Sequence, residues 1–311
     1  MHDSLITRLK NSSKGVPALL NARGTCICLY DEDSGGPVWV SKSASNEIGV
    51  RRLRAEYDAL LYLEPCAEQM NIPRVLDWEE SPDGCTLVQS GIRGKHHPAA
   101  ISGSASSNEL NRRFGGVVAW INRLQQAVPS PSRKSLRRLA AEFAGRLEHH
   151  PEFGRIAASL ASILRNPPVL GNRNAVPAHG DFYYRNVLFS GREVGVVDWG
   201  SFGGGFPLQD KFSYVVNSDY VLNNRCGTRL QNYHHVFFSP SRACSYALGM
   251  AKGAGWNEEQ TRFLFYCFLA TEICLDSDQI PVSDWCEILQ YLDHYGYPTP
   301  GINLPPPATA V

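Results

Sequence analysis

The sequence predicts an α+β protein of two lobes, with a small β-rich N-lobe at residues 1–95 and a larger helical C-lobe at residues 96–298. Two hairpin patterns and one helical pattern fall in the first part, whereas apolar residues at helical spacing dominate the second part. The length of 311 residues is too great for one small core and predicts two lobes or one large domain. A proline-rich tail at residues 299–311 ends the chain.

The N-lobe contains two predicted β-hairpins with a helix between them. Residues 24–31 and 37–44 are β-rich, and the turn-forming sequence EDSGG separates them. Residues 47–63 place apolar side chains at helical spacing and are therefore expected to form a helix. The strand-like runs RVLDWEE and CTLVQS then flank the turn sequence SPDG. This second hairpin ends at a predicted hinge, residues 89–95, which leads into the C-lobe.

The C-lobe is predicted to be mainly helical. A link of small and polar residues, 97–110, precedes its first helix. The runs with helical spacing are FGGVVAWINRLQQAV, SLRRLAAEFAGRLEHH, FGRIAASLASILRN, YALGMAKGAGW, EEQTRFLFYCFLATEICL and DWCEILQYLDHYG. A β-hairpin interrupts them between the third and fourth runs, because VLFS (187–190) and VGVV (194–197) flank a short turn at residues 191–193.

The composition of the chain excludes several classes of protein. Hydrophobic residues make up 43% and charged residues 19%, which is ordinary for a globular enzyme. A formal net charge of +0 argues against nucleic-acid binding, which a concentrated basic excess would indicate. No apolar run approaches the roughly 18 residues of a membrane span, and the N-terminus lacks the apolar core of a signal peptide. The 9 cysteines are scattered, so reduced thiols in a cytoplasmic protein are expected, as a monomer or a homodimer.

Three polar residues in AHGDFYYRNVLFSGREVGVVDW, residues 178–199, carry the candidate chemistry. Antiparallel pairing places the residue before the first strand beside the residue after the second, so Asn186 and Asp198 are expected to meet. An amide oxygen and a carboxylate are hard ligands that suit Mg²⁺ and are poor for zinc. Asp181, in the same loop, could orient an attacking hydroxyl or accept its proton. The alternative is that both aspartates are ordinary turn residues and that Asn186 is a cap.

The ordered set HGDxxxxN (179–186), DWG (198–200) and PLxD (207–210) resembles a known family pattern. It is similar to the catalytic loop and metal-binding motif of the aminoglycoside phosphotransferase and choline kinase-like superfamily. The resemblance is strongest from about residue 165 to residue 215. It implies a bilobal protein-kinase-like fold and ATP-dependent transfer of the γ-phosphate to a hydroxyl of a small molecule. In that pattern Asp181 is the catalytic residue, and Asn186 and Asp198 hold Mg²⁺.

The resemblance also implies residues that hold ATP. In such enzymes a strand lysine positions the phosphates, and a helix glutamate pairs with it. Lys42 lies in the second predicted strand and Glu56 on the following helix, whereas Glu47 precedes the apolar pattern and fits less well. Gln89 and Gly91 lie where a hinge would offer backbone groups to adenine. The alternatives are that Lys42 is a solvated strand lysine, that Glu56 is a solvated helix acid, and that Gln89 and Gly91 belong to a plain interlobe linker.

The acceptor is the open part of this prediction. Arg185 directly precedes Asn186, and Tyr183 and Tyr184 add an aromatic wall that can form hydrogen bonds. An arginine at this place would repel a polyamine and suits a sugar, a carboxylate or a phosphorylated compound. The hypothesis is therefore a neutral or anionic hydroxyl compound, such as a sugar. The alternative for Arg185 is an ion pair with a structural acid.

Three other functions stay open. An aminoglycoside O-phosphotransferase would need acids for its polycationic acceptor, and the best cluster is Glu272 with Asp276 and Asp278, which can also be a solvated helix end. A pseudokinase that binds nucleotide without transfer is favoured by the phosphate loop, because SSKG and NARG near the N-terminus are no glycine-rich fingerprint. A metal-dependent hydrolase using His179 lacks further histidines at useful spacing.

Overall fold

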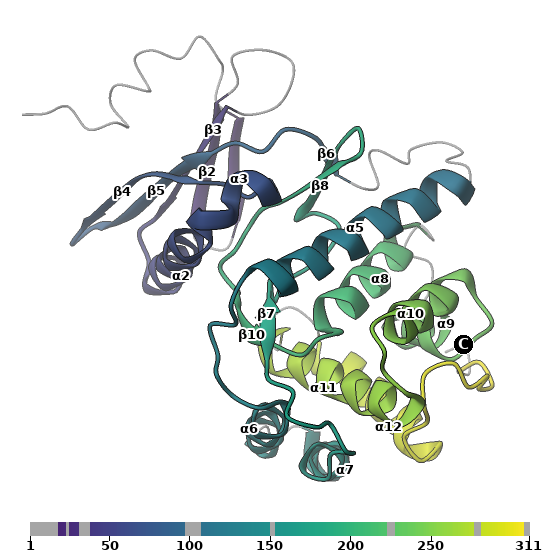
Figure 1. Cartoon of the computed structure of the whole chain (residues 1–311). Helices are drawn as coiled ribbons and strands as arrows, with labels where there is room; N and C mark the ends of the chain where they lie inside the picture. The colour runs from purple at the N-terminus through teal and green to yellow at the C-terminus, as the bar shows by residue number, and fades with distance from the viewer. Residues whose placement is uncertain are drawn as a thin grey trace, which may run out of the picture. The chain divides into compact units, whose positions relative to one another are not determined.

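The computed structural model of the chain describes residues 18–22, 25–30, 38–96, 107–149, 153–222, 228–276 and 281–307. The chain forms two compact units, whose elements are labelled in Figure 1. The first, here called the sheet unit, comprises the described residues up to 128 together with residues 184–203. The second, called the helical unit, comprises residues 129–183 and the described residues from 204 onward.

A five-stranded antiparallel sheet forms the centre of the sheet unit. Its strand order is β1-β2-β3-β5-β4. The strands are β1 (Ala18–Ala22), β2 (Thr25–Tyr30), β3 (Trp39–Ala44), β4 (Val75–Ser81) and β5 (Gly84–Ser90). Both predicted hairpins are observed, as β2 with β3 and as β4 with β5. Strand β1 was not predicted, because its sequence ALLNA lacks the β-branched residues that are typical of strands.

Helix α2 (Glu47–Leu63) has the bounds that the sequence predicts. Asn46 caps its N-terminus, because the Asn46 side-chain oxygen accepts a hydrogen bond from the Gly49 N–H at 2.8 Å. The buried face of α2 consists of Gly49, Leu53, Glu56, Ala59, Leu60 and Leu63. Tyr57 stacks on Trp78 of β4, with 4.7 Å between the ring centroids. The helix therefore presents one acid, Glu56, on its buried face.

A second sheet in the sheet unit contains the predicted metal-binding hairpin. Its strand order is β6-β8-β9. The strands are β6 (Lys95–His96), β8 (Val187–Ser190) and β9 (Glu193–Val196), and both pairs are antiparallel. The helical segments of this unit that follow α2 are η1 (Glu64–Cys66), α3 (Ala67–Met70) and α5 (Ser107–Ala127).

Two hydrogen bonds attach this hairpin and α5 to the end of α3. The Val196 N–H donates to the Asn71 carbonyl at 3.3 Å, and the Trp120 indole donates to the Met70 carbonyl at 2.7 Å. Residues 107–128 and the hairpin thus belong to the sheet unit, although the division made from the sequence assigned them to the C-lobe. The lobe boundary near residue 95 stays a prediction.

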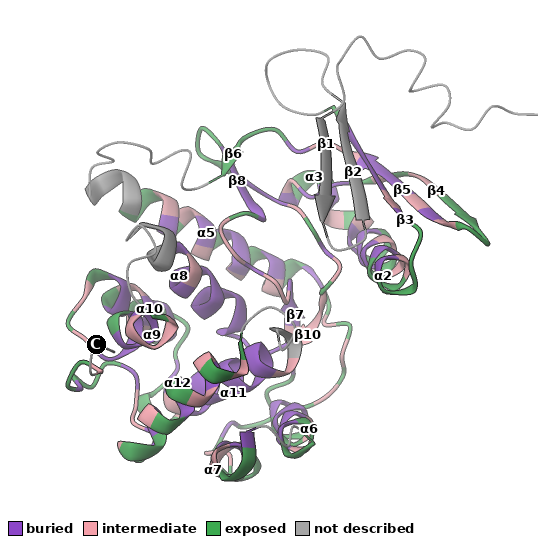
Figure 2. Ribbon diagram, turned by 180° about the vertical axis from the view of Figure 1, so that it is seen from behind, coloured by how far each residue is buried: buried purple, intermediate pink, exposed green. Residues whose placement is uncertain are grey.

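The helical unit is built around an aromatic core. Its elements are α6 (Leu136–Glu148), α7 (Gly154–Arg165), β7 (Val176–Ala178), β10 (Gly203–Gly205), α8 (Gln209–Leu222), α9 (Arg229–Phe237), α10 (Arg242–Gly253), α11 (Glu258–Asp276) and α12 (Val282–His294). Phe237 lies 5.4 Å from Phe212 and 4.6 Å from Phe265, measured between ring centroids. Helices α8 and α11 are buried along most of their described length (Figure 2). Because α8 is buried on nearly all sides, it lacks a clear apolar stripe, and neither α8 nor α9 was predicted.

The described part of the proline-rich tail is attached to the helices by hydrogen bonds at Gly301, Leu304 and Pro305. The Gly301 N–H donates to the Phe237 carbonyl at 2.7 Å. The His234 ring nitrogen lies 2.9 Å from the Leu304 carbonyl, and the Tyr291 hydroxyl donates to the Pro305 carbonyl at 2.6 Å. Because proline lacks a backbone N–H, a proline-rich segment cannot pair its backbone groups with one another, and these bonds to the helices satisfy them instead.

Six of the cysteines are free thiols, in agreement with the expectation of reduced thiols. They are Cys66, Cys85, Cys244, Cys267, Cys274 and Cys286. Burial raises the pKa of the Cys267 thiol well above its usual value, so this thiol is kept protonated inside the helical unit. In the described ranges no helix combines the length and apolar character needed to cross a membrane.

Candidate active site

Lys42 lies at the centre of a buried ion-pair cluster in the sheet unit. It is on β3, opposite Leu87 of β5, and its Nζ atom is 2.7 Å from both carboxylate oxygens of Glu56 on α2. Oδ1 of Asp198 lies 3.4 Å from the same Nζ atom. Lys42 is 7% exposed and Glu56 is 3% exposed, whereas the rival acid Glu47 is exposed. The structure thus brings three of the predicted site residues together.

The charges of this cluster keep Lys42 protonated. Burial disfavours the ammonium form, but the carboxylates of Glu56 and Asp198 outweigh this effect, so the pKa of Lys42 is raised above its usual value. Burial also raises the pKa of Glu56, and the Lys42 ammonium and a hydrogen bond from the Trp199 backbone oppose that rise. A cation fixed in this way, in surroundings of low dielectric, interacts strongly with an anion.

The β8–β9 hairpin differs from the predicted hairpin in its turn. Val187 lies opposite Val196, so the turn consists of Gly191 and Arg192, and Glu193 is already part of β9. Gly191 has φ +61°, as the first residue of a two-residue hairpin turn requires. The prediction of a three-residue turn was therefore wrong. The strand pattern did not show that Glu193 pairs within the ladder, because a polar residue is equally common in turns.

The shorter turn changes the position of Asp198 relative to Asn186. The Val197 N–H donates to the Asn186 carbonyl at 3.0 Å, so Val197, and not Asp198, lies directly opposite Asn186. Asp198 follows with φ +68°, a left-handed conformation that costs a non-glycine residue about 1 kcal/mol or more and is frequent at functional sites. Trp199 is fully buried, and its indole donates to the Val196 carbonyl at 3.0 Å. The backbone turn therefore buries Trp199, whereas the Asp198 side chain is 53% exposed.

Asn186 and Asp198 fit the chemistry of a magnesium site. Both offer oxygen donors, which Mg²⁺ prefers. Asn186 is 4% exposed, and it is held at the end of β8 by the ladder. Across the described ranges no group of three or more His, Cys, Asp or Glu side chains could hold a metal. Mg²⁺ usually binds one or two side chains and completes its octahedral shell with water and substrate phosphates.

The loop with Asp181 lies in the helical unit and is held by Asp210. The backbone N–H groups of His179 and Gly180 donate to the two carboxylate oxygens of Asp210 at 2.8 and 3.1 Å. The Asp181 N–H lies 3.3 Å from Nδ1 of His179, so this ring supports the loop backbone. Gly180 has φ +83°, a conformation that glycine adopts without strain. These contacts fix the backbone around Asp181, whose side chain is partly exposed.

Asp210, the last residue of the PLxD motif, supports the loop from the first helix that follows it. It lies in the first turn of α8 and is 1% exposed. Burial raises the pKa of Asp210 to about 6, although the two backbone donors and Lys211 oppose this rise. The PLxD motif marked the residue, but its contact with a loop 30 residues earlier in the chain is a tertiary feature without a local signal.

Arg185 is exposed next to Asn186 and has aromatic and basic neighbours. Its Nε donates to the Tyr184 hydroxyl at 3.0 Å, and its guanidinium lies 5.6 Å from the centroid of that ring. Burial lowers the pKa of His96 on β6, and the charge of Arg185 acts in the same direction. No carboxylate pairs with Arg185 in the described part of the chain, contrary to the alternative of an ion pair with a structural acid. Tyr183 is partly exposed and belongs to the helical unit.

The two predicted hinge residues, Gln89 and Gly91, differ in which hydrogen-bonding groups are still without a partner. The Gly91 N–H already donates to the Val38 carbonyl at 2.8 Å, so this group is occupied within the sheet unit. Gln89 is 2% exposed, and its side-chain Oε1 is buried without a hydrogen-bond partner in the described structure. The backbone role expected for the hinge stays a prediction, whereas the Gln89 side chain is an unexpected polar group.

The residues expected to serve a cationic acceptor are only partly described. Glu272 lies on α11 in the helical unit and is 9% exposed, so it is not a solvated helix end. The Asp276 side chain and all of Asp278 lie outside the described structure, as does the sequence SSKG. Of the second phosphate-loop candidate, NARG, the structure describes only Asn21 and Ala22 at the end of β1.

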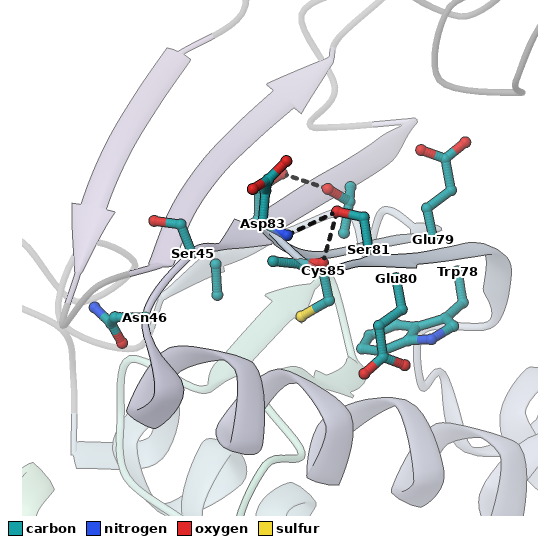
Figure 3. A pocket seen from close by; sticks show the side chains of 12 residues that line it. Ser45, Asn46, Trp78, Glu79, Glu80, Ser81, Asp83 and Cys85 are labelled. Atoms are coloured by element: carbon teal, nitrogen blue, oxygen red, sulfur yellow. Dashed lines mark hydrogen bonds between the residues drawn. The ribbon is translucent and has the colours of Figure 1, made fainter.

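A separate hollow of about 960 Å³ lies beside the β4–β5 turn and the start of α2, and it contains none of the predicted site residues (Figure 3). Its acids do not converge: Glu79 and Glu80 point to opposite sides of β4, as neighbouring strand residues do. Glu80 forms an ion pair with Arg54. The hollow therefore lacks the converging polar groups of a catalytic centre.

Comparison with known proteins identifies both family and fold. Residues 30–241 match the Phosphotransferase enzyme family, whereas no curated protein matches the chain. Aminoglycoside phosphotransferase APH(3'')-Id from Streptomyces rimosus ATCC10970 is 18% identical, with a TM-score of 0.56 over 85% of this chain and 95% of its own. The GDP complex of aminoglycoside 2'-phosphotransferase-IIIa is 15% identical, with a TM-score of 0.60 over 94% and 97%. Amicoumacin kinase hAmiN is 13% identical, with a TM-score of 0.55 over 97% and 98%.

The structural likenesses confirm the predicted bilobal, kinase-like α+β fold. The family match covers more than half of the chain and includes the HGDxxxxN and DWG motifs. Together they confirm the resemblance seen in the sequence. The chain belongs to the phosphotransferase enzyme family and is a kinase-like enzyme that transfers phosphate to hydroxyl groups of small molecules.

Proposed function

We propose that the protein transfers the γ-phosphate of ATP to a hydroxyl of a small neutral or anionic compound, such as a sugar. The observation that carries the proposal is the buried cluster of Lys42 with Glu56 and Asp198, in which one cation is fixed on the face of a sheet. Lys42 positions the phosphates of the nucleotide, and Glu56 holds Lys42 in place. Such positioning and charge stabilisation are the main sources of catalysis in phosphoryl transfer.

The proposal also includes a bound nucleotide and a magnesium ion. Structural neighbours of this chain are complexes with ADP, with GDP and with AMP-PNP and Ca²⁺, which supports nucleotide binding. Asn186 and Asp198 would hold Mg²⁺, which neutralises charge on the phosphates when it is bound. The exposed carboxylate of Asp198 and its left-handed backbone support this role.

Asp181 orients the acceptor hydroxyl and accepts its proton during the transfer. The carboxylate is placed by the loop backbone, which Asp210 holds through the N–H groups of His179 and Gly180. A base that is displaced by about 1 Å loses much of its effect, so this support from α8 contributes to the rate.

The charge around Arg185 supports a neutral or anionic acceptor. Arg185 presents an exposed guanidinium beside Asn186, and Lys95 lies on the strand β6, which pairs with β8. A polycation would be repelled here, whereas a carboxylate, a phosphate or a sugar hydroxyl can accept hydrogen bonds from the guanidinium. We expect Arg185→Gln to raise the KM for the acceptor roughly tenfold, because a charge-assisted hydrogen bond is lost.

Aminoglycoside phosphorylation is the second candidate, because several structural neighbours are complexes with streptomycin or kanamycin. The buried Glu272 is the described acid that could serve such an acceptor. We also propose a cytoplasmic location, which the free thiols of the described cysteines support, because thiols stay reduced in that compartment.

A screen of nucleotide consumption separates these functions. Wild type and Asp181→Asn are incubated with ATP, Mg²⁺ and a panel of sugars, sugar acids, amino alcohols and aminoglycosides. We expect consumption that depends on Asp181 and on a sugar or an anionic acceptor. Efficient turnover of kanamycin-type compounds alone would establish the second candidate instead. Nucleotide binding without consumption on any acceptor would identify a pseudokinase.

A further inference from the structure

The side chain of Gln89 is a buried polar group that the fold itself does not explain. Gln89 is 2% exposed, and its Oε1 atom has no hydrogen-bond partner in the described structure. Buried side-chain oxygens in native proteins nearly always have a partner, and a buried acceptor without one opposes folding. Such a group persists where a ligand supplies the missing donor, because the residue then serves binding rather than stability.

The register of the sheet places Gln89 on the same face as Lys42. On β3 and β5, Lys42 lies opposite Leu87, and Val40 lies opposite Gln89. Residues directly opposite in an antiparallel pair share a face, and so do residues two apart along a strand. Gln89 therefore lies one rung from Lys42, roughly 7 Å along the strand direction. Val40 and Leu87, both buried, form an apolar surface between the two polar side chains.

This face has the composition of a nucleotide site. A cation at one end suits phosphates, and the apolar surface of Val40 and Leu87 suits the flat face of a base. The carboxamide of Gln89 then lies where the edge of the base arrives.

We infer that the Gln89 carboxamide reads the nucleobase and that its Oε1 atom accepts a hydrogen bond from the exocyclic amine of adenine. The inference rests on the proposed function and adds to it the choice of base. The atom without a partner is an acceptor, so the site calls for a donor. Adenine presents an amine at its six-position, whereas guanine presents a carbonyl oxygen, which cannot donate to Oε1. The structural neighbours include both a GDP complex and an ADP complex, so they do not decide between guanine and adenine for this chain.

The test compares wild type with Gln89→Met, which keeps the length of the side chain and removes its hydrogen-bonding atoms. Thermal unfolding is followed without ligand and with ADP or GDP in the presence of Mg²⁺. We expect ADP to stabilise wild type more than GDP does. Gln89→Met should weaken ADP binding roughly tenfold and leave GDP binding unchanged within twofold. Without ligand, Gln89→Met should unfold at a higher temperature, because the unpaired amide is gone.

Thr86→Val is the matched control, since Thr86 lies on the same strand and its hydroxyl is 2.9 Å from the Ser43 hydroxyl on the opposite face. It should leave the ratio of ADP to GDP binding unchanged. Equal binding of both nucleotides by wild type, or an equal loss of both in Gln89→Met, would overturn the inference while the proposed function stands. Failure of wild type to bind either nucleotide would overturn both.

Discussion

At the scale of the residue, the unusual feature is a lysine and a glutamate that are both buried. Burying a charge pair costs about as much in desolvation as the attraction returns, so such a pair is weak support for stability. Lys42 and Glu56 are 7% and 3% exposed, and both carboxylate oxygens of Glu56 contact Nζ. The pair is therefore best explained by function, as a device that fixes a cation on the sheet.

The cost of breaking this pair can be measured. Lys42→Met leaves Glu56 buried without its partner, and we expect the free energy of unfolding to fall by about 3–5 kcal/mol. The double variant Lys42→Met with Glu56→Met should recover most of this loss, because an apolar pair of similar volume fills the same space. Urea unfolding measures both values, and neither variant should transfer phosphate.

The partly exposed pair of Lys134 and Glu142 provides the control. Lys134→Met should change the free energy of unfolding by about 1 kcal/mol or less, because solvent screens an exposed pair. If Lys42→Met is equally mild, the cluster is not a tightly coupled buried pair and its explanation as a functional device fails.

At the scale of the element, two contacts position the predicted site residues. One holds the β8–β9 hairpin in the sheet unit, and the other holds the loop with Asp181 in the helical unit. In the sheet unit, β9 packs closely against the end of α3, because Gly195 has no side chain. A Cβ atom at Gly195 would lie 2.4 Å from Cγ2 of Ile92 and 2.6 Å from Nδ2 of Asn71. Glycine at this position therefore allows the hairpin with Asn186 to approach the rest of the sheet unit.

Gly195→Ala should displace the hairpin and lower the free energy of unfolding by about 1–3 kcal/mol through overpacking. Transfer activity should fall more than nucleotide binding, because Asn186 and Asp198 move with the hairpin. Gly115→Ala in α5 is the control: nothing lies within 4 Å of its Cβ position, so it should stabilise the helix by about 0.5–1 kcal/mol. Equal stability of the two variants would contradict the close approach seen here.

In the helical unit, α8 attaches the catalytic loop through Asp210, and this contact predicts a pH dependence. Burial raises the pKa of Asp210 from 3.8 to about 6, so folding favours the protonated carboxyl. Its contribution to stability is complete below about pH 3.8 and is lost as the pH rises through 6. Asp210→Asn lacks this titration.

The stability of wild type relative to Asp210→Asn should therefore decline as the pH rises from 4 to 6, by about 1 kcal/mol per pH unit. Urea unfolding at a series of pH values measures the difference. Parallel curves for the two proteins would show that Asp210 titrates at its ordinary pKa. Transfer activity of Asp210→Asn should be reduced above pH 6, where wild type has the carboxylate, because an amide cannot accept both loop N–H groups as the carboxylate does.

At the scale of the whole molecule, the predicted site residues are divided between the two units along the chain. The HGDxxxxN motif crosses from one unit to the other between Tyr183 and Tyr184. Asp181 belongs to the helical unit, whereas Lys42, Glu56, Asn186 and Asp198 belong to the sheet unit. If the proposed function holds, variants of Lys42 and variants of Asp181 should affect different steps, the first nucleotide binding and the second phosphate transfer.

Much of this arrangement could be predicted from the sequence, because periodic patterns and ordered motifs are local. The bounds of α2, both hairpins of the sheet unit and the pairing candidates Lys42 and Glu56 all follow from such signals. Helix α8 could not be predicted in this way, because it is buried on nearly all sides. The contact of Asp210 with the loop and the unpaired oxygen of Gln89 depend on tertiary packing, which no short stretch of sequence encodes.

The most direct test of the account is the transfer of the terminal phosphate itself. ATP labelled at the γ-phosphate is incubated with Mg²⁺, the acceptor found by screening, and either wild type or Asp181→Asn, and the label on the acceptor is measured. We predict label on an acceptor hydroxyl with wild type, and a loss of at least about 100-fold in its rate with Asp181→Asn, because the hydroxyl then lacks its base. Label that appears at equal rates with both proteins, or that never leaves the nucleotide although the nucleotide binds, would contradict the account.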